Sequence, residues 1–248
     1  MLEFHSVSCT IKKKEILRDI SFSVKSGRIV ALLGKNGSGK TTLLRAANLE
    51  IPHEGSILLN REPIHSFSPR ERARRMAYLP QRLAAPAMSV SSLVSLGRLP
   101  HMPPFSRLSV YDRTTVLEAL KATDALSLAE RPVHALSGGE RQRAHLAMAI
   151  AQGAPLLLLD EPTTYLDTDA RRSFFSLLAG LVRSEGKAAL CVLHDINDAI
   201  RLADDIALLE NGRLVFFGST AVFIEGNLPT KHFGLVAHKT AGDLPFYY

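Results

Sequence analysis

The chain has 248 residues, which is enough for one large domain or for a core with an added lobe. Its composition, 46% hydrophobic and 22% charged, is that of an ordinary soluble globular protein. Its apolar runs, such as residues 188–193, have the length of a strand rather than of a bilayer span, and residues 1–5 lack the basic start and apolar stretch of a signal peptide.

The cysteine positions and the net charge indicate the cellular compartment and limit the possible binding partners. Cys9 and Cys191 are far apart in strand-like segments, so we interpret them as small core residues in a reducing compartment and expect a cytosolic chain. The formal net charge is +6. A solvated basic surface explains most of this excess, and the charge alone does not choose between that explanation, anionic lipid and nucleic acid.

Strands and helices alternate along most of the chain. Apolar runs and period-two alternation predict strands, and 3.6-residue periodicity with capping signals predicts helices. The predicted strands are residues 2–7, 16–24, 29–33, 56–59, 76–79, 156–159, 188–193, 206–209 and 214–217. The predicted helices follow residue 41, follow the capping box at Ser68–Glu71, and cover 110–123, 143–152, 169–185 and 197–203. This order favours a largely parallel α/β sheet with ligands at the strand carboxyl ends.

Three local features accompany these elements. Lys12, Lys13, Lys14 and Glu15 read as a solvated hairpin turn. Residues 82–104 are rich in proline, serine and small residues, which predicts a surface-exposed insertion or lobe boundary. In the helix at 110–123, three apolar residues are expected to share one face, namely Val116, Leu117 and Leu120.

A glycine-rich loop follows the strand at 29–33. It fits the P-loop pattern G-x-x-x-x-G-K-[ST] between a buried strand and a helix, where backbone N–H groups and a helix dipole converge on a phosphate. We therefore predict that this loop binds a nucleotide, with Lys40 bridging the two terminal phosphates and the Thr41 hydroxyl holding Mg²⁺. The binding residues expected here are Gly34, Lys35, Asn36, Gly37, Ser38, Gly39, Lys40, Thr41 and Thr42.

Polar residues end three other strands. Asp160 and Glu161 follow four leucines, and two adjacent acids there suit a nearby cation, with Asp160 holding Mg²⁺ and Glu161 polarising the attacking water. The alternative is a simple capped strand end. Gln81 and His194 also follow strands, so both could reach the γ-phosphate, with Gln81 acting through Mg²⁺ or water. Each of these two residues is weak evidence alone. Their order along the chain relative to the P-loop and Asp160-Glu161 strengthens the assignment of both.

Together these residues resemble the ATP-binding subunit of an ABC transporter, over residues 1–220. Leu136-Ser137-Gly138-Gly139-Glu140 is similar to the family signature, residues 156–161 to Walker B, and Leu166-Asp167 to the D-loop. Gln81 matches the Q-loop and His194 the switch histidine. The resemblance implies an α/β fold, namely a P-loop NTPase core with a mainly parallel sheet, an N-terminal antiparallel β subdomain and an inserted α-helical subdomain.

The same resemblance implies a domain plan and a dimer. One ABC ATPase domain is expected over 1–248, with the core at 1–81 and 141–220, the helical insertion at 82–140 and a tail at 221–248. Ser137, Gly138 and Gly139 would form a second phosphate-binding nest. Since one chain cannot usefully aim both nests at one phosphate, a head-to-tail homodimer that sandwiches ATP is expected.

Two positions depart from the family pattern. The place of the adenine-stacking aromatic holds Ile11, which packs on a base without the π-stacking contribution, so base affinity and selectivity are expected to be weaker. The signature ends in Glu140 instead of the commoner glutamine, a change that we expect to be tolerated.

Narrower features resemble the subfamily that serves importers of iron–siderophore, haem and cobalamin complexes. They are residues 78–81, Gly97-Arg98-Leu99-Pro100-His101 and residues 160–167. We therefore expect an ATPase with ATP and Mg²⁺ that energises uptake of a metal chelate. It would act at the cytoplasmic face of the inner membrane with permease subunits, docked through residues 82–110, and indirectly with a substrate-binding protein.

Three rival interpretations remain open. A soluble ABC-type ATPase acting on nucleic acid or ribosomes would suit the basic charge, but such proteins usually carry two cassettes or a long coiled coil, so no nucleic acid partner is expected. A cassette that serves a different transport substrate is the second. A degenerate cassette that only binds ATP is disfavoured because Lys40, Glu161 and His194 are intact.

Overall fold

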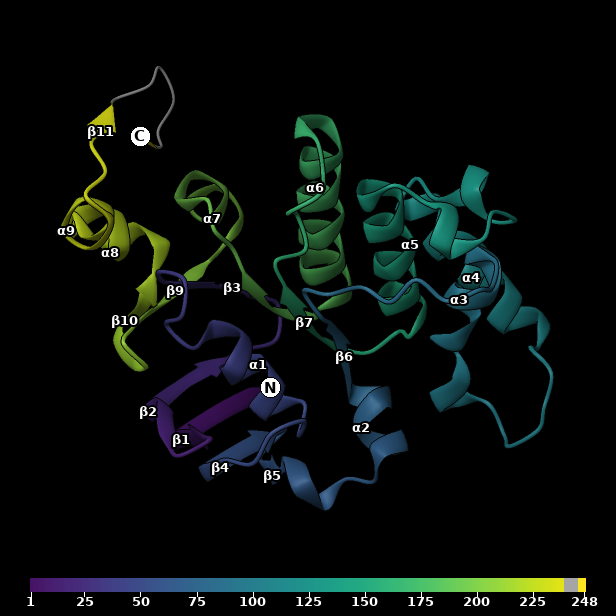
Figure 1. Cartoon of the computed structure of the whole chain (residues 1–248), viewed down its shortest axis with the longest axis horizontal. Coiled ribbons are helices and arrows are strands. Elements are labelled where there is room, and N and C mark those ends of the chain that lie inside the picture. The colour runs from purple at the N-terminus through teal and green to yellow at the C-terminus, as the bar shows by residue number, and fades with distance from the viewer. Residues whose placement is uncertain (239–244) are drawn as a thin grey trace. The chain divides into compact units, whose positions relative to one another are not determined.

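The computed structural model describes residues 1–238 and 245–248 (Figure 1). The chain divides into two compact units: Met1–Ile64 with Ala188–Tyr248, and His65–Lys187. Among the described residues, no helix has the length and apolar character needed to cross a membrane.

An antiparallel sheet opens the first unit, with strand order β2-β1-β4-β5. It contains β1 (Leu2–Ile11), β2 (Lys14–Val24), β4 (Glu54–Leu59) and β5 (Glu62–Pro63). The predicted alternation in β2 is confirmed, since Ile20, Phe22 and Val24 are buried. The predicted turn at 12–15 is too long, because only Lys12 and Lys13 turn the chain, with φ of 47° and 65°. Two positive φ values match the twist of a tight hairpin.

The second sheet of this unit supplies its parallel strands. β3 (Ile29–Leu33) lies between β8 (Ala188–Val192) and β9 (Asp205–Glu210) and is parallel to both, and β10 (Arg213–Ser219) is antiparallel to β9. Every residue of β3 and β8 is buried, including Cys191, as their continuous apolar runs predict. Helix α1 (Lys40–Ala47) follows β3, and α7 (Ile196–Leu202) follows β8.

The carboxyl-terminal part of this unit is more structured than its sequence suggests. It forms α8 (Thr220–Glu225), α9 (Leu228–Phe233) and a hairpin of β11 (Ala237–His238) and β12 (Phe246–Tyr247), and of the predicted tail only residues 239–244 lie outside the described residues. Asn197 of α7 fixes this end. Its side chain donates to the Tyr247 carbonyl at 2.9 Å and accepts from the Tyr247 amide at 2.8 Å.

The second unit contains two parallel strands, β6 (Met76–Leu79) and β7 (Leu156–Asp160). Helix α2 (Pro69–Arg75) leads into β6. The capping box predicted at Ser68 and Glu71 is confirmed: each side chain bonds the backbone N–H of the other residue. Helix α6 (Thr168–Glu185) follows β7, and short 3-10 turns complete the fold, namely η1 (Ile64–Ser66), η2 (Leu99–His101), η3 (Leu126–Leu128) and η4 (Val133–Ala135).

Helices α3 (Val90–Leu96), α4 (Val110–Ala122) and α5 (Gly138–Ala151) contact one another around a shared apolar cluster (Figure 1). The prediction that residues 82–104 are surface-exposed is therefore wrong for α3, whose Val90 and Val94 are fully buried. The predicted apolar face of α4 is right for Val116 and Leu120 and wrong for Leu117, which is 41% exposed. Positions i and i+4 share a helix face, whereas the next position points about 100° away.

Helix α5 begins earlier than predicted, at Gly138 instead of Arg143. Its two glycines form the first helical turn instead of a preceding loop. They can do so because Ser137 is the N-cap and completes a capping box with Glu140, which satisfies amide donors that a helix start leaves free.

Candidate functional site

Backbone geometry explains the glycines of the P-loop. Gly34, Gly37 and Gly39 have φ of 147°, 80° and 104°, in the region that side chains disfavour. A Cβ on Gly34 would lie 2.3 Å from the Leu209 carbonyl oxygen, and one on Gly39 would lie 2.5 Å from Leu17 Cδ2. At Gly34 and Gly39 the loop thus runs too close to β9 and β2 for a side chain, whereas residues 35–37 are exposed and can face a ligand.

Lys40 begins α1 and turns back onto this loop. Its side chain is buried at 6% exposure, and Nζ donates to the carbonyl oxygens of Gly34 at 2.7 Å and Lys35 at 3.2 Å. The loop is tightened further by a bond from the Ser38 amide to the Lys35 carbonyl at 3.1 Å. A fixed cation therefore lies beside the loop, and Thr41 and Thr42 follow in the first turn of α1.

A hollow of about 250 Å³ opens on the loop and is lined by Lys35, Asn36, Gly37, Ser38, Glu210 and Asn211. The Ser38 hydroxyl is buried and has no hydrogen-bond partner among residues 1–238 and 245–248. Glu210 is held by His232 of α9, with Nδ1 and Oε1 2.9 Å apart. Loop amides, a cation and an unsatisfied buried hydroxyl fit an oxygen-rich anion such as a polyphosphate.

His194 and Ile11 lie in the same unit. β8 ends at Val192 and pairs in parallel with β3, so His194 and the P-loop both follow the carboxyl ends of neighbouring strands. The His194 side chain is exposed, next to Asp195, which caps α7 through the Asn197 amide at 2.8 Å. Ile11 is the half-buried last residue of β1. Its predicted packing on a base remains a prediction.

Gln81 and the acidic pair lie in the other unit. β6 and β7 run in parallel, with Leu79 opposite Leu159. Gln81 and Asp160-Glu161 therefore lie at the same edge of the sheet, where both strands have their carboxyl ends. Asp160 is fully buried at the end of β7. Glu161 has a φ of 54°, and the Thr164 hydroxyl donates to its Oε2 at 3.2 Å. Two carboxylates and an amide are oxygen donors of the type that Mg²⁺ prefers.

The signature residues form the N-terminal turn of α5. The Ser137 amide donates to Glu140 Oε2 at 2.8 Å, and Arg131 Nη1 donates to Oε1 at 2.6 Å. The bonds from Ser137, with Arg131 assisting, hold the pKa of Glu140 below its ordinary value of 4.5. The carboxylate at this place thus has two partners of its own, which supports the expectation that it is tolerated there.

Tyr165 and Pro162, which follow β7, contact α5 near its start. The sequence analysis gives neither of them a role of its own. A Cβ on Gly138 would meet the Tyr165 ring at 3.2 Å, and one on Gly139 would meet the Tyr165 carbonyl oxygen at 2.9 Å. The Gln142 side chain, buried at 2% exposure, donates to the Pro162 carbonyl at 2.8 Å. Adjacent glycines in a helix were the available signal for such a close approach.

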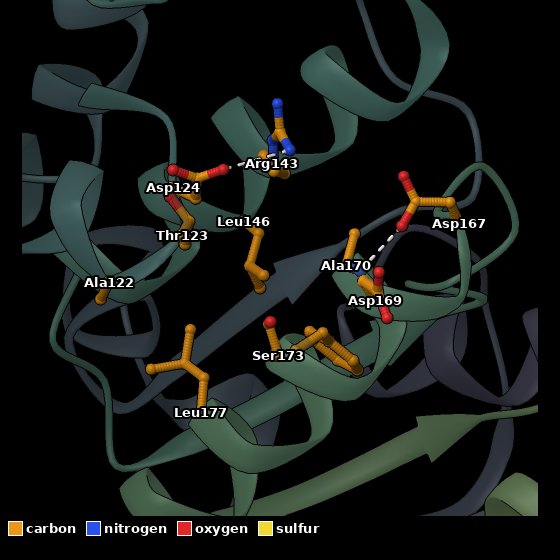
Figure 2. A pocket seen from close by; sticks show the side chains of 11 residues that line it. Ala122, Thr123, Asp124, Arg143, Leu146, Asp167, Asp169, Ala170, Ser173 and Leu177 are labelled. Carbon is orange, nitrogen blue, oxygen red and sulfur yellow. Dashed lines mark hydrogen bonds and ion pairs between the residues drawn. The ribbon is translucent and has the colours of Figure 1, made fainter. Parts of the chain in front are cut away.

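A second hollow, also of about 250 Å³, lies among α4, α5 and α6 (Figure 2). Leu146 and Leu177 line its apolar part, and Arg143 faces Asp124 at 3.4 Å. Asp167, the D-loop residue, caps α6 at its edge by accepting from the Ala170 amide at 2.8 Å. None of the residues predicted to bind nucleotide or metal lines this hollow.

Known proteins are similar to this chain in sequence. The iron(3+)-hydroxamate import ATP-binding protein FhuC of Bacillus subtilis (strain 168) is 43% identical over 206 residues, covering 82% of the chain and 77% of that protein. The ferric enterobactin transport ATP-binding protein FepC of Escherichia coli (strain K12) is 37% identical over 90% of the chain and 83% of its own length. The hemin import ATP-binding protein HmuV of Pseudomonas entomophila (strain L48) is 42% identical over 86% and 84%.

Solved structures agree. A structure described as a metal-chelate type ABC transporter in an inward-facing conformation superposes with a TM-score of 0.82 at 28% identity, covering 100% of this chain and 95% of that one. The cassette MJ0796, as a dimer with ADP and Pi, gives 0.81 at 27% identity, covering 89% and 99%. These similarities confirm the predicted P-loop NTPase fold. The model of the ABC transporter family matches residues 17–164, and the chain belongs to this family as an ATP-binding subunit.

Proposed function

We propose that the chain is the ATP-hydrolysing subunit of an importer that takes up an iron–siderophore or a related metal chelate, such as haem. The observation that carries this proposal is the agreement among the relatives. Proteins named for import of iron(3+)-hydroxamate, ferric enterobactin and hemin each align with more than four fifths of the chain. The chelate itself would be recognised elsewhere in the transporter.

The P-loop supplies the phosphate site in this proposal. Lys40 would neutralise the terminal phosphates from the place where its ammonium now bonds the carbonyls of Gly34 and Lys35. The loop amides and the first turn of α1 would bind the remaining phosphate oxygens. Ile11 would pack against the base with its aliphatic side chain, without an aromatic stack.

Catalysis would depend on the polar residues that end the parallel strands. Thr41, Gln81 and Asp160 are assigned to hold Mg²⁺, which would supply charge stabilisation to the phosphates when bound. Glu161 is assigned to orient and polarise the attacking water, with its carboxylate held by Thr164. His194 would contact the γ-phosphate region and respond to its loss.

A second copy of the chain is part of this proposal. Gly138 and Gly139 present helix amides, and Ser137 precedes them as the N-cap whose own amide bonds Glu140. Together these three residues would cover the nucleotide on the P-loop of the partner. The MJ0796 cassette, which is similar to this chain, forms a dimer. ATP binding would close the two copies, and hydrolysis with release of products would open them. Permease subunits at the cytoplasmic face of the membrane would receive this motion, and a substrate-binding protein would act indirectly.

One experiment tests the proposal against its rivals. The purified chain is assayed for ATP hydrolysis, for co-purification with detergent-solubilised permease subunits, and for nucleic acid binding at physiological salt. Hydrolysis with permease binding is the expected result. Nucleic acid binding without permease binding would favour the soluble ATPase, and ATP binding without hydrolysis would favour a structural cassette. Uptake assays with different chelates would then identify the cargo or reveal another substrate.

A further inference from the structure

The segment Gly97-Arg98-Leu99-Pro100-His101 follows α3 and lies outside the nucleotide site. Its first residue, Gly97, lies close to the backbone at the end of α5. A Cβ on Gly97 would lie 2.4 Å from the Met148 carbonyl oxygen and 3.1 Å from the Gln152 nitrogen. No side chain fits between these backbones, so glycine permits a direct approach of this segment to α5.

Arg98 extends this contact into the helical cluster. The side chain is buried at 6% exposure, and its Nη1 donates to the Ala151 carbonyl at 2.8 Å. Its Nε donates to Asp112 Oδ1 at 2.9 Å, in the first turn of α4. One guanidinium therefore joins the last turn of α5 to the first turn of α4 with a charge-assisted pair.

His101 and Gln152 form the next link. His101 Nε2 lies 2.8 Å from the Gln152 carbonyl oxygen, and because a carbonyl only accepts, the proton resides on Nε2. The Gln152 side chain connects this end of α5 to α2 and β6. It donates to the carbonyl oxygens of Met76 at 2.9 Å and Ala73 at 2.5 Å, where α2 passes into β6.

Two arginines of α2 complete the junction. The Pro100 carbonyl oxygen accepts from Arg74 Nε at 2.7 Å and from Arg70 Nε at 2.9 Å. A second Arg70 nitrogen donates to the Met102 carbonyl. Residues 97–102 are thus bonded to α5 on one side and to α2 on the other, within one unit.

The elements joined here lead to two parts of the proposed ATP site. Helix α5 starts at the signature glycines and ends at this junction, about 20 Å away at 1.5 Å per residue. Strand β6 starts at Met76 and leads to Gln81. We propose that Gly97–His101 is a positioning clamp that fixes the signature helix relative to strand β6, which leads to Gln81. This inference rests on the proposed function, and Arg98 and His101 act as positioning residues without touching the nucleotide.

The clamp also corrects an expectation about this segment. Arg98 and His101 were expected on the surface that meets a membrane partner, yet Arg98 is buried and His101 turns toward Gln152. Leu99, between them, is 56% exposed. The polar residues of this segment therefore act inward, whereas Leu99 and residues 103–107 are exposed.

The test compares His101→Ala with His101→Gln, whose amide can donate from nearly the same place. ATP hydrolysis is measured against ATP concentration in the full chain, alongside the melting temperature. We expect His101→Ala to lower kcat by about fivefold or more with KM changed less than about twofold, because one bond of the junction is lost while the P-loop is intact. His101→Gln should restore kcat.

Arg74→Ala is an independent test of the clamp, because Arg74 is exposed and its replacement leaves the buried residues unchanged. It should lower kcat in the same way, whereas His65→Ala, which changes an exposed histidine of the same unit, should behave as the parent. Unchanged kcat in both clamp variants, or a loss that follows the melting temperature and that His101→Gln fails to restore, would overturn the clamp. A parent chain without hydrolysis would instead overturn the proposed function.

Discussion

Glu161 leaves β7 in a left-handed conformation, with φ of 54°, which is uncommon for a residue other than glycine. The turn that follows supports it, because the Thr164 hydroxyl bonds both its carboxylate at 3.2 Å and its carbonyl at 3.3 Å. Strained residues of this type persist where the surroundings fix them, and they gather at functional sites. The carboxylate therefore has a hydrogen-bond donor beside it within the same turn, before any ligand binds.

Replacing this carboxylate gives the first prediction. Glu161→Gln keeps the shape and the bond from Thr164 but loses the basic oxygen. We expect ATP binding to persist and hydrolysis to fall by about two to four orders of magnitude, the usual cost of losing a general base. Nucleotide titration and phosphate release measure the two effects. Glu118→Gln, an exposed change in α4, is the control. Hydrolysis within a few-fold of the parent would assign the role elsewhere, first to His194.

Lys40 carries the second prediction. Lys40→Ala removes the buried ammonium that lies against the P-loop carbonyls. Hydrogen bonds to charged groups contribute about 1.5–3 kcal/mol each, so the affinity for ATP should fall by more than about tenfold. Titration with ATP measures it, with the exposed Lys25→Ala as the matched control. Near-normal affinity would remove Lys40 from the phosphate site.

Glycine-to-alanine substitutions can distinguish two effects on stability, namely the higher helix propensity of alanine and the clash of its Cβ with a neighbouring residue. Alanine favours a helix over glycine by about 1 kcal/mol, so Gly180→Ala in α6, where a Cβ meets nothing within 4 Å, should raise the melting temperature. Gly139→Ala should lower it, because its Cβ would press on the Tyr165 backbone at 2.9 Å. Gly138→Ala should fall between them, since the Tyr165 ring can move. Equal effects at all three positions would contradict the contact with Tyr165.

Among the elements, α4 depends on a buried ion pair. Arg98 and Asp112 side chains are 6% and 11% exposed, and Ser109 bonds the same carboxylate at 2.6 Å. These bonds, first from Ser109 and then from Arg98, hold the pKa of Asp112 below its ordinary value of 3.8. A lowered folded-state pKa contributes stability at pH values above 3.8, and this contribution is lost as the pH falls through the folded-state pKa.

Asp112→Asn tests this linkage. At pH 7 the variant should have a lower free energy of unfolding than the parent, because Arg98 keeps its charge without a carboxylate. The difference between the two proteins should stay constant near neutrality and narrow below pH 3.8. Chemical denaturation across this range measures it. A difference that does not change with pH would mean that the Asp112 charge contributes nothing to folding.

Local signals explain which elements the sequence predicts well. The buried runs of β3, β7 and β8 and the capping box before α2 depend on a few adjacent residues, and the structure has all of them. Helix α3 was missed because its serine-rich sequence resembles a loop, and only packing against α4 and α5 buries Val90 and Val94. The order of the carboxyl-terminal hairpin likewise comes from a distant contact, the pair of bonds from Asn197.

The candidate site follows the same division. Each predicted residue lies at a strand end or a helix start, which periodicity and glycine spacing reveal. Contacts between residues that are far apart in the sequence leave no such local pattern. Arg131 with Glu140 and Gln142 with Pro162 are two examples. Arg98 shows the limit most clearly, since an arginine in a proline-rich segment suggests a surface, and only the structure places it against Asp112 and Ala151.

For the molecule as a whole, exposed apolar residues indicate where a partner binds. Large apolar side chains face solvent on the segment that is expected to meet the permease, residues 82–110. Leu99, Phe105 and Val110 are 56%, 107% and 73% exposed. Exposed apolar residues that cluster in one stretch of sequence suit a protein partner better than a polyanion, so they favour permease docking over nucleic acid binding.

The last prediction tests this surface in the transporter. The isolated chain should hydrolyse ATP weakly, and uptake should need permease subunits. Replacing Leu99, Phe105 and Val110 together by serine should leave ATP affinity within about twofold of the parent, because none of them lies at the P-loop. Permease co-purification and uptake should fall by about tenfold or more, as when anchors of an interface are truncated. Val222→Ser, an equally accessible apolar position in the other unit at 52% exposure, controls for loss of surface apolarity. If uptake and co-purification survive the triple substitution, the permease docks elsewhere on the chain.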